Sequence, residues 1–181
     1  VYTEGGFYLD TDVELLKPLD PLTKYNAVAG WESQFWFTTS FFGAAQHSPW
    51  IAKILKRYEV ANPNRRITTD TFMKTVHSPS VYAKDIFGLK LDGQTRVYGD
   101  NNLAVFAPEY FSPKHYMTGE VHQTPNTIAF HHYASTWHNK TDEAKTKLSA
   151  ASYRMLGPEK YARLEKEYNK SIERKIRREL P

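Results

Sequence analysis

Short apolar runs that end at polar side chains are the clearest pattern in the chain. Residues 7–9 (Phe-Tyr-Leu) form an apolar run between the Gly5-Gly6 turn and Asp10-Thr11-Asp12. Residues 127–130 form a similar run that leads straight into His131-His132. Both runs are predicted to be strands, and in open α/β sheets a ligand site lies beyond the carboxyl ends of the strands. The pattern therefore predicts that the two polar groups meet in space.

The remaining periodicity alternates between strands and helices. Ser48 is a suitable N-cap and Pro49 a suitable first residue for a helix whose apolar positions recur from Trp50 to Tyr58. Further strands are predicted at residues 27–30, 34–37, 95–98 and 103–106, further helices at residues 67–76, 142–156 and 158–176, and a loop at residues 108–119. This mixture predicts one α/β domain with a helical C-terminal part.

The composition fits one folded domain and narrows its chemistry. The 181 residues are 40% hydrophobic and 24% charged, which are ordinary values for a domain with a core. Because cysteine is absent, disulfides, thiolate zinc sites and cysteine nucleophiles are excluded. No run reaches the ~18 consecutive apolar residues that a membrane-spanning helix needs. The chain starts at Val1 in what reads as the middle of a longer sequence, so an N-terminal part is expected to be missing.

The net charge of +4 comes from the C-terminal part of the chain. Residues 140–181 carry 12 Lys and Arg against 7 Asp and Glu, whereas residues 1–139 carry 12 against 13. No segment resembles a nucleic-acid-binding module, so no nucleic-acid partner is expected. The basic positions could touch an anionic membrane surface, although a solvated helix face is the commoner use of such residues. These basic positions are Arg174, Lys175, Arg177 and Arg178.

Two carboxylates at positions i and i+2 just beyond a strand can reach one cation if the backbone turns there. Asp10 and Asp12 would supply hard oxygen ligands that suit Mg²⁺ or Mn²⁺, and an imidazole ligand would favour Mn²⁺. Such an ion would act as a Lewis acid on a diphosphate leaving group. Adjacent histidines on a strand point to opposite faces, so only one of His131 and His132 is expected to face the ion and the other to be structural. The bare Asp-x-Asp pattern is also common in solvated surface turns.

The sequence around these residues resembles a known family of enzymes. Residues 2–14 (YTEGGFYLDTDVE) are similar to the signature of the sugar-binding, DXD-containing glycosyltransferases of family 32. That family includes bacterial capsular-polysaccharide transferases and fungal mannosyltransferases. Residues 131–137 (HHYASTW) are similar to its closing motif, and the two motifs are specific as a pair. Weaker similarity covers residues 15–20, 41–44, 48–51, 108–114 and 118–120.

The resemblance implies a GT-A fold, a Rossmann-like α/β domain, over residues 1–140, with residues 141–181 as a basic helical extension packed on it. It implies that a sugar moves from a nucleotide-sugar donor, expected to be a UDP-sugar, to a saccharide or lipid-linked acceptor in polysaccharide synthesis, with retention of anomeric configuration. Relatives carry an additional N-terminal stretch that supplies much of the nucleobase pocket. The expected location is the cytoplasm, with peripheral contact at the inner face of the membrane.

The resemblance also implies roles for individual residues. Asp12 would ligate Mn²⁺ or Mg²⁺ directly, Asp10 would hold donor hydroxyls and a metal-bound water, and His132 would be a further metal ligand. Ser135 and Trp137 would lie on a mobile loop that closes over the donor diphosphate and excludes water. Catalytic roles are expected for Asp10, Asp12 and Trp137, and donor contacts for Tyr8, Asp10, Ser135 and Trp137.

Two other interpretations remain open. Leu9-Asp10-Thr11-Asp12-Val13 also resembles the first motif of haloacid-dehalogenase-like phosphatases, in which Asp10 would be a phosphorylated nucleophile. The Gly-Thr step and the late acidic pair of those enzymes have no convincing counterpart here. A non-catalytic carbohydrate-binding module is compatible with the aromatic content of 14%. Trp31 and Glu32 occupy a position at which glycosyltransferase relatives contact sugar.

Overall fold

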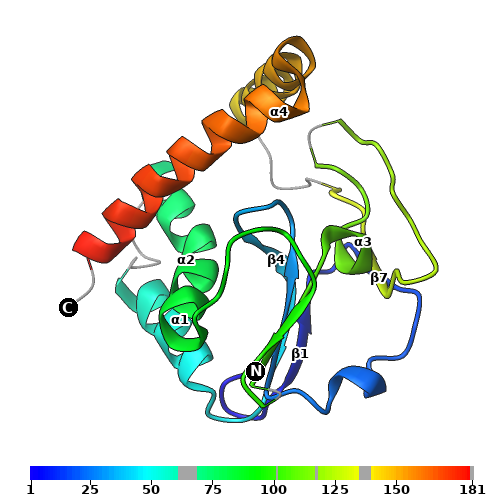
Figure 1. Ribbon diagram of the computed structural model, residues 1–181, viewed down its shortest axis with the longest axis vertical. Helices are drawn as coiled ribbons and strands as arrows, with labels where there is room; N and C mark the ends of the chain where they lie inside the picture. Colours follow the sequence, from blue (N-terminus) through cyan, green and yellow to red (C-terminus); the bar gives the residue numbers. More distant parts are fainter. Residues whose placement is uncertain (61–68, 101, 117, 135–139, 180–181) are drawn as a thin grey trace.

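The centre of the molecule is a five-stranded mixed sheet (Figure 1). The computed structural model describes residues 1–60, 69–100, 102–116, 118–134 and 140–179. Within these residues β3 and β6 are the parallel pair of the sheet, and its other neighbouring strands are antiparallel. In spatial order the strands are β1 (Gly6–Leu9), β4 (Phe37–Ala44), β3 (Ala27–Trp31), β6 (Leu103–Phe106) and β5 (Arg96–Tyr98). A mixed sheet of this kind is compatible with a GT-A-like fold.

A second, two-stranded sheet joins β2 (Val13–Leu15) to β7 (Ala129–His131) in antiparallel fashion. The described helices are the 3₁₀ helix η1 (Asp20–Leu22), α1 (Pro49–Val60), α2 (Thr69–Phe87), the short α3 (Pro108–Phe111) and the long α4 (Lys140–Arg178). Figure 1 shows α1 and α2 together on one side of the large sheet, with α4 extending along the molecule to lie over α2. None of the described helices has the length and apolarity needed to cross a bilayer.

The two faces of the large sheet bury separate hydrophobic clusters. Alternate residues of β3 point to opposite faces, so Ala29 and Trp31 join the cluster under α1 and α2 while Val28 joins the cluster around Phe111. Gly43 permits close packing on the second face, because a Cβ at this position would lie 2.3 Å from the ring of Phe7. The sheet is thus covered on both faces, and only its strand ends and connecting loops remain for function.

The structure corrects three predicted elements. Residues 34–36 are not a strand; the strand begins at Phe37 and continues through a run of hydroxyl side chains to Ala44. This run is largely buried because β4 lies between β1 and β3, so it lacks the alternation of a half-exposed strand. The helix predicted at residues 67–76 extends to Phe87, and the loop predicted at residues 108–119 contains α3.

The C-terminal half of α4 is bound to the rest of the fold by apolar and ionic contacts. Ile172 and Ile176 are buried in the cluster under α1 and α2. Lys175 pairs with Asp70 at 2.7 Å, and Arg177 pairs with Asp85 at 2.7 Å. Two cations of the predicted basic surface are therefore partly neutralised within the molecule, which leaves less charge for an anionic membrane. Gly157, with φ 75° and ψ 163°, breaks the helix where the Gly-Pro step predicted a boundary.

His77 of α2 is buried without hydrogen-bond partners among the described residues. Its ring stacks on Trp36 with the centroids 4.0 Å apart, and neither ring nitrogen has a partner. Burial lowers the pKa of His77 from 6.5 to about 4, because a charged imidazole would lose its hydration there. The folded protein therefore holds this histidine in its neutral form.

We expect this histidine to destabilise the fold in mild acid. The unfolded chain takes up the proton near pH 6.5 and the folded chain only near pH 4, so stability is lost as the pH falls between these values. By pH 5 the loss is about 2 kcal/mol relative to His77→Phe, which keeps the stacked ring. Urea unfolding at pH 7 and pH 5 measures it, with the exposed His122→Phe as the matched control. Equal pH dependence in the wild type and His77→Phe would contradict the burial argument.

Candidate functional site

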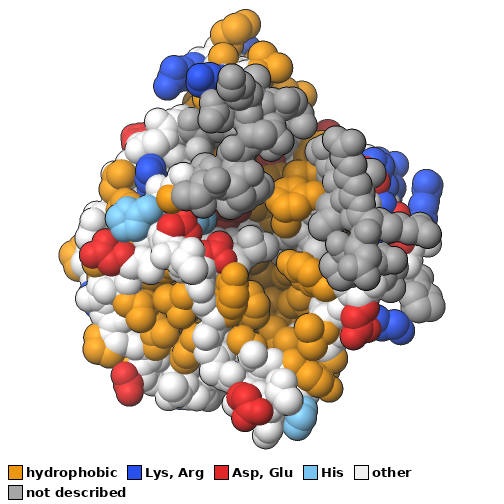
Figure 2. Space-filling model, turned by 180° about the vertical axis from the view of Figure 1, so that it is seen from behind, with side chains coloured by type: hydrophobic (Ala, Val, Ile, Leu, Met, Phe, Trp, Pro, Cys, Tyr) orange, Lys and Arg blue, Asp and Glu red, His pale blue; other side chains and the backbone are white. Residues whose placement is uncertain are grey.

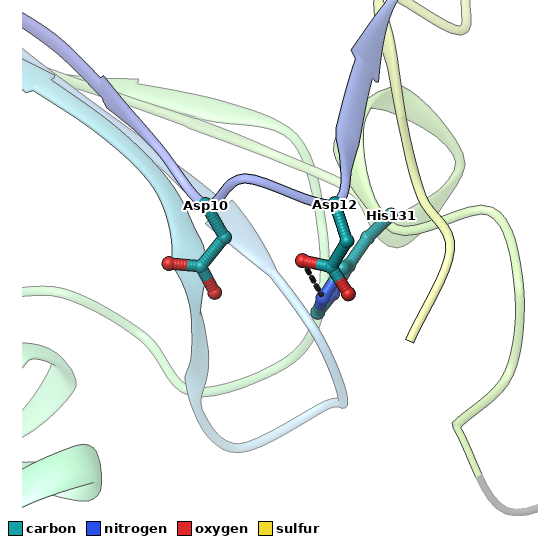
Figure 3. A group of neighbouring side chains, drawn as sticks. All are labelled: Asp10, Asp12 and His131. Carbon is teal, nitrogen blue, oxygen red and sulfur yellow. Dashed lines mark ion pairs between the residues drawn. The ribbon is translucent and has the colours of Figure 1, made fainter. Parts of the chain in front are cut away.

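The loop after β1 carries two carboxylates on one side. The Asp10 backbone N–H donates to Ser40 O at 2.9 Å, which fixes the loop to β4, and the Val13 N–H donates back to Asp10 O at 3.1 Å. This turn allows the chain to leave the large sheet and enter the small one at β2. Figure 3 shows the Asp10 and Asp12 carboxylates pointing the same way from the loop. The predicted turn between the two residues is therefore present.

His131, at the end of β7 and more than 100 residues along the chain, lies beside the two carboxylates. The pairing of Val13 with His131 brings the end of β7 to the start of β2. The His131 Nε2 atom lies 3.4 Å from Asp12 Oδ1 (Figure 3). One ligand atom from each of Asp10, Asp12 and His131 lies within 4.8 Å of the others. The prediction that residues after the two apolar runs meet in space is confirmed.

These three residues fit a divalent cation by their chemistry. Carboxylate oxygens with one imidazole nitrogen form a donor set that suits Mn²⁺ and similar ions. Burial alone would raise the pKa of Asp12, but the Ala134 N–H and the neighbouring His131 outweigh it and lower the pKa below its usual value. Burial lowers the pKa of His131, against the influence of the two aspartates. Asp12 is therefore ionised and His131 neutral at pH 7, as metal ligands must be.

His132 was the predicted ligand, whereas the structure brings His131 to the two aspartates. His132 points away from the aspartates, and its Nε2 atom lies 3.0 Å from Glu14 Oε2 on the exposed face of the small sheet. The pairing sets this outcome, because Val13 lies opposite His131 and Glu14 opposite Phe130. Side chains alternate along β7, so His131 takes the inner face and His132 the face shared with Phe130 and Glu14. The alternation was predictable, but the strand register was not.

Tyr8 supports the first aspartate. Its hydroxyl donates to Asp10 Oδ1 at 2.6 Å, and this hydrogen bond, together with burial, raises the pKa of Tyr8 to about 12. The ring also stacks on Phe42 with the centroids 5.1 Å apart. Tyr8 therefore holds one carboxylate in position at the edge of the site, where its predicted contact with a donor is sterically available.

The predicted residues Ser135 and Trp137 lie outside the described part of the chain. The residue just before them, Ala134, belongs to the site, because its N–H donates to Asp12 Oδ2 at 2.9 Å. The residue before it, Tyr133, has φ 53°, in the left-handed region that a bulky side chain seldom adopts. Such strain commonly accompanies a functional site.

Sequence reasoning missed the pairing of Tyr133 with Glu32. The Tyr133 hydroxyl donates to Glu32 Oε1 at 3.0 Å, and the Tyr133 ring packs on His131 with the centroids 3.8 Å apart. Burial raises the pKa of Glu32 to about 7, and this hydrogen bond lowers it only in part. The available signal was the position of Glu32 directly after β3, which repeats the position of Asp10 directly after β1.

Two cavities adjoin this group of residues. One, of about 480 Å³, opens beside Asp10 and is lined by Tyr8, Thr38 and Thr39 together with apolar side chains of α1 and α2. The other, of about 380 Å³, opens beside Glu32. Figure 2 shows hydrophobic side chains gathered around a hollow in the middle of one face of the molecule. Volumes of this order are typical of small-molecule sites.

Comparison with known families supports the same location. Residues 1–29 match the family model of the glycosyltransferase sugar-binding region containing the DXD motif. The matched segment includes Tyr8, Asp10 and Asp12, so the resemblance to this glycosyltransferase family is confirmed over these residues. The match suggests a glycosyltransferase. No curated protein and no solved structure matches the chain.

The geometry predicts which histidine matters for metal binding. We expect His131→Ala to weaken Mn²⁺ binding at least about tenfold, a loss typical even for residues that only support metal ligands. The matched variant His132→Ala should bind Mn²⁺ as the wild type does, since its side chain contacts Glu14 instead. Calorimetric titration with Mn²⁺ measures both affinities, and metal-free melting temperatures report the fold. A larger loss in His132→Ala than in His131→Ala would refute the assignment.

Proposed function

We propose that this protein is a metal-dependent, retaining glycosyltransferase of GT-A type that uses a nucleotide-sugar donor. The observation that carries the proposal is that one ligand atom from each of Asp10, Asp12 and His131 lies within 4.8 Å of the others. Asp10 and Asp12 belong to the matched sugar-binding region, and His131 comes from a strand outside it. Isolated acidic turns are common, but an acidic turn joined by a neutral imidazole from a distant strand is a much more selective arrangement. The UDP group, the saccharide or lipid-linked acceptor and a role in polysaccharide synthesis are the finer parts of this proposal.

The three residues would hold Mn²⁺ or Mg²⁺ next to the donor diphosphate. When bound, the ion supplies positive charge that stabilises the leaving diphosphate. Asp12 is held for this role by the Ala134 N–H and His131, and Asp10 by Tyr8. Residues fixed by such hydrogen bonds need little rearrangement when a ligand arrives.

The cavity beside Asp10 is the proposed donor site. The Thr39 hydroxyl can bond to an oxygen of the nucleotide-sugar donor, the Tyr8 hydroxyl can accept from a sugar hydroxyl while it donates to Asp10, and the apolar wall supplied by α1 and α2 suits a flat base. Ala134, which contacts Asp12, directly precedes Ser135 in the sequence. For this reason Ser135 and Trp137 are assigned contacts with the diphosphate in our proposal. In this proposal residues 1–140 form the catalytic core and residues 141–181 the extension.

Replacing Asp12 should remove the activity and preserve the fold. We expect Asp12→Asn to lower Mn²⁺-dependent hydrolysis and transfer from a panel of nucleotide sugars at least about 100-fold, since Lewis-acid stabilisation is worth several kcal/mol. Nucleotide release measures the rate, with and without a chelator. Asp100→Asn, at an exposed turn, is the matched control and should behave as the wild type.

Three outcomes would contradict the proposal. Unchanged donor turnover in Asp12→Asn would remove the metal site from the reaction. Robust Mg²⁺-dependent turnover of a chromogenic phosphomonoester by the wild type would favour the phosphatase with Asp10 as nucleophile. Saccharide binding with no turnover of any donor would favour the non-catalytic carbohydrate-binding module.

A further inference from the structure

The cavity beside Glu32 is built from three separate parts of the chain. Its walls come from the turn after β3, from α3 with the segment that follows it, and from the middle of α4. The cavity, of about 380 Å³, therefore lies between elements and not within one of them.

Aromatic rings line one side of this cavity in a continuous series. His115 stacks on Tyr116 with the centroids 5.4 Å apart, and its other neighbour is Tyr153 at 5.2 Å. Tyr153 in turn packs edge-to-face on Tyr161 at 5.3 Å. The C–H faces of a pyranose ring pack well on such rings, because both surfaces are apolar and the ring face is electron-rich.

The cavity also carries hydrogen-bonding carboxyl groups, without a cation among the described lining residues. Glu32 and Glu165 line the cavity, and no Lys or Arg lines it among the described residues. Burial raises the pKa of both carboxyls, to about 7 for Glu32, and lowers the pKa of His115. Carboxyl groups bond readily to sugar hydroxyls, but an anionic sugar would find no countercharge here.

A chain of contacts connects this cavity to the metal group. Glu32 accepts from the Tyr133 hydroxyl, the Tyr133 ring packs on His131, and His131 lies 3.4 Å from Asp12. Tyr133 is therefore the residue between Glu32 of this cavity and His131 of the metal group, where the leaving group is proposed to lie. The larger cavity instead adjoins Asp10.

We propose that the cavity lined by Glu32, Tyr116, Tyr153, Tyr161 and Glu165 binds the sugar end of the acceptor, and that this sugar is uncharged. The proposal rests on the glycosyltransferase function proposed above. It assigns the acceptor class, a neutral saccharide, from the aromatic wall, the carboxyl groups and the lack of a lining cation.

The test separates acceptor binding from donor chemistry. Saturation-transfer NMR with neutral disaccharides (maltose, cellobiose, lactose) should detect binding that Tyr153→Ala weakens at least about tenfold, as expected for a lost aromatic contact in a pocket. Tyr153→Phe keeps the ring and should keep the binding. Tyr168→Ala, on the same helix and not in the cavity, is the matched control. A disaccharide ending in a uronic acid should bind at least about tenfold more weakly than its neutral counterpart, since a buried unpaired charge is unfavourable.

Kinetics supply the second readout. Tyr153→Ala and Glu165→Gln should raise the acceptor KM while Mn²⁺-dependent donor hydrolysis without acceptor stays at the wild-type rate; Glu167→Gln, exposed on α4, should change neither. No neutral saccharide bound by the wild type, equal affinity for the uronic acid, or unchanged acceptor binding in Tyr153→Ala would each overturn the acceptor proposal. If the wild type showed no donor hydrolysis, the proposed function would be contradicted instead. The NMR titration would still decide whether the cavity binds a neutral sugar.

Discussion

The pairing of β2 with β7 is the interaction on which the candidate site depends. Three strand positions, from Val13 opposite His131 to Leu15 opposite Ala129, join the beginning of the chain to a segment that follows all five strands of the large sheet. Without this small sheet Asp10 and Asp12 would be an ordinary acidic turn. With the small sheet, a neutral imidazole lies beside the two aspartates. A further backbone hydrogen bond, donated by the His132 N–H to Asp12 O at 3.0 Å, fixes the loop itself.

A one-residue shift in that register would rebuild the site. Side chains alternate across a strand, so moving β7 by one residue would place His132, and not His131, on the face of Val13. This sensitivity explains why the sequence predicted that the two polar groups meet but not which histidine lies beside the aspartates. The apolar runs before Asp10 and His131 and their polar ends are local features, and they were read correctly. Which side chains of a strand face the site depends on the register with the neighbouring strand. The sequence near His131-His132 does not reveal that Val13 is the residue opposite His131.

The same distinction separates the predicted and unpredicted parts of the fold. The Ser48-Pro49 helix start and the Gly157-Pro158 break are local chemistry, and both occur at the predicted places. The strand at Phe37–Ala44 was missed because burial on both faces removes the alternation that marks a strand, and its Thr38 and Ser40 hydroxyls bond to each other at 2.7 Å instead of to water. The cavity beside Glu32 could not be predicted either, since three segments that are distant in the sequence form it.

The proposed retention of configuration would place a geometric demand on the two cavities. In a retaining transfer by front-side attack, the acceptor hydroxyl approaches from the side on which the diphosphate leaves, so acceptor and leaving group must be neighbours. The proposed acceptor cavity is joined through Glu32 and Tyr133 to His131, a residue of the proposed leaving-group site. Tyr133, whose backbone has φ 53°, makes both contacts: its hydroxyl donates to Glu32 and its ring packs on His131. In our proposal Tyr133 thus joins the acceptor cavity to the metal group, which would keep acceptor and leaving group on one side of the donor, as front-side attack requires and back-side attack does not.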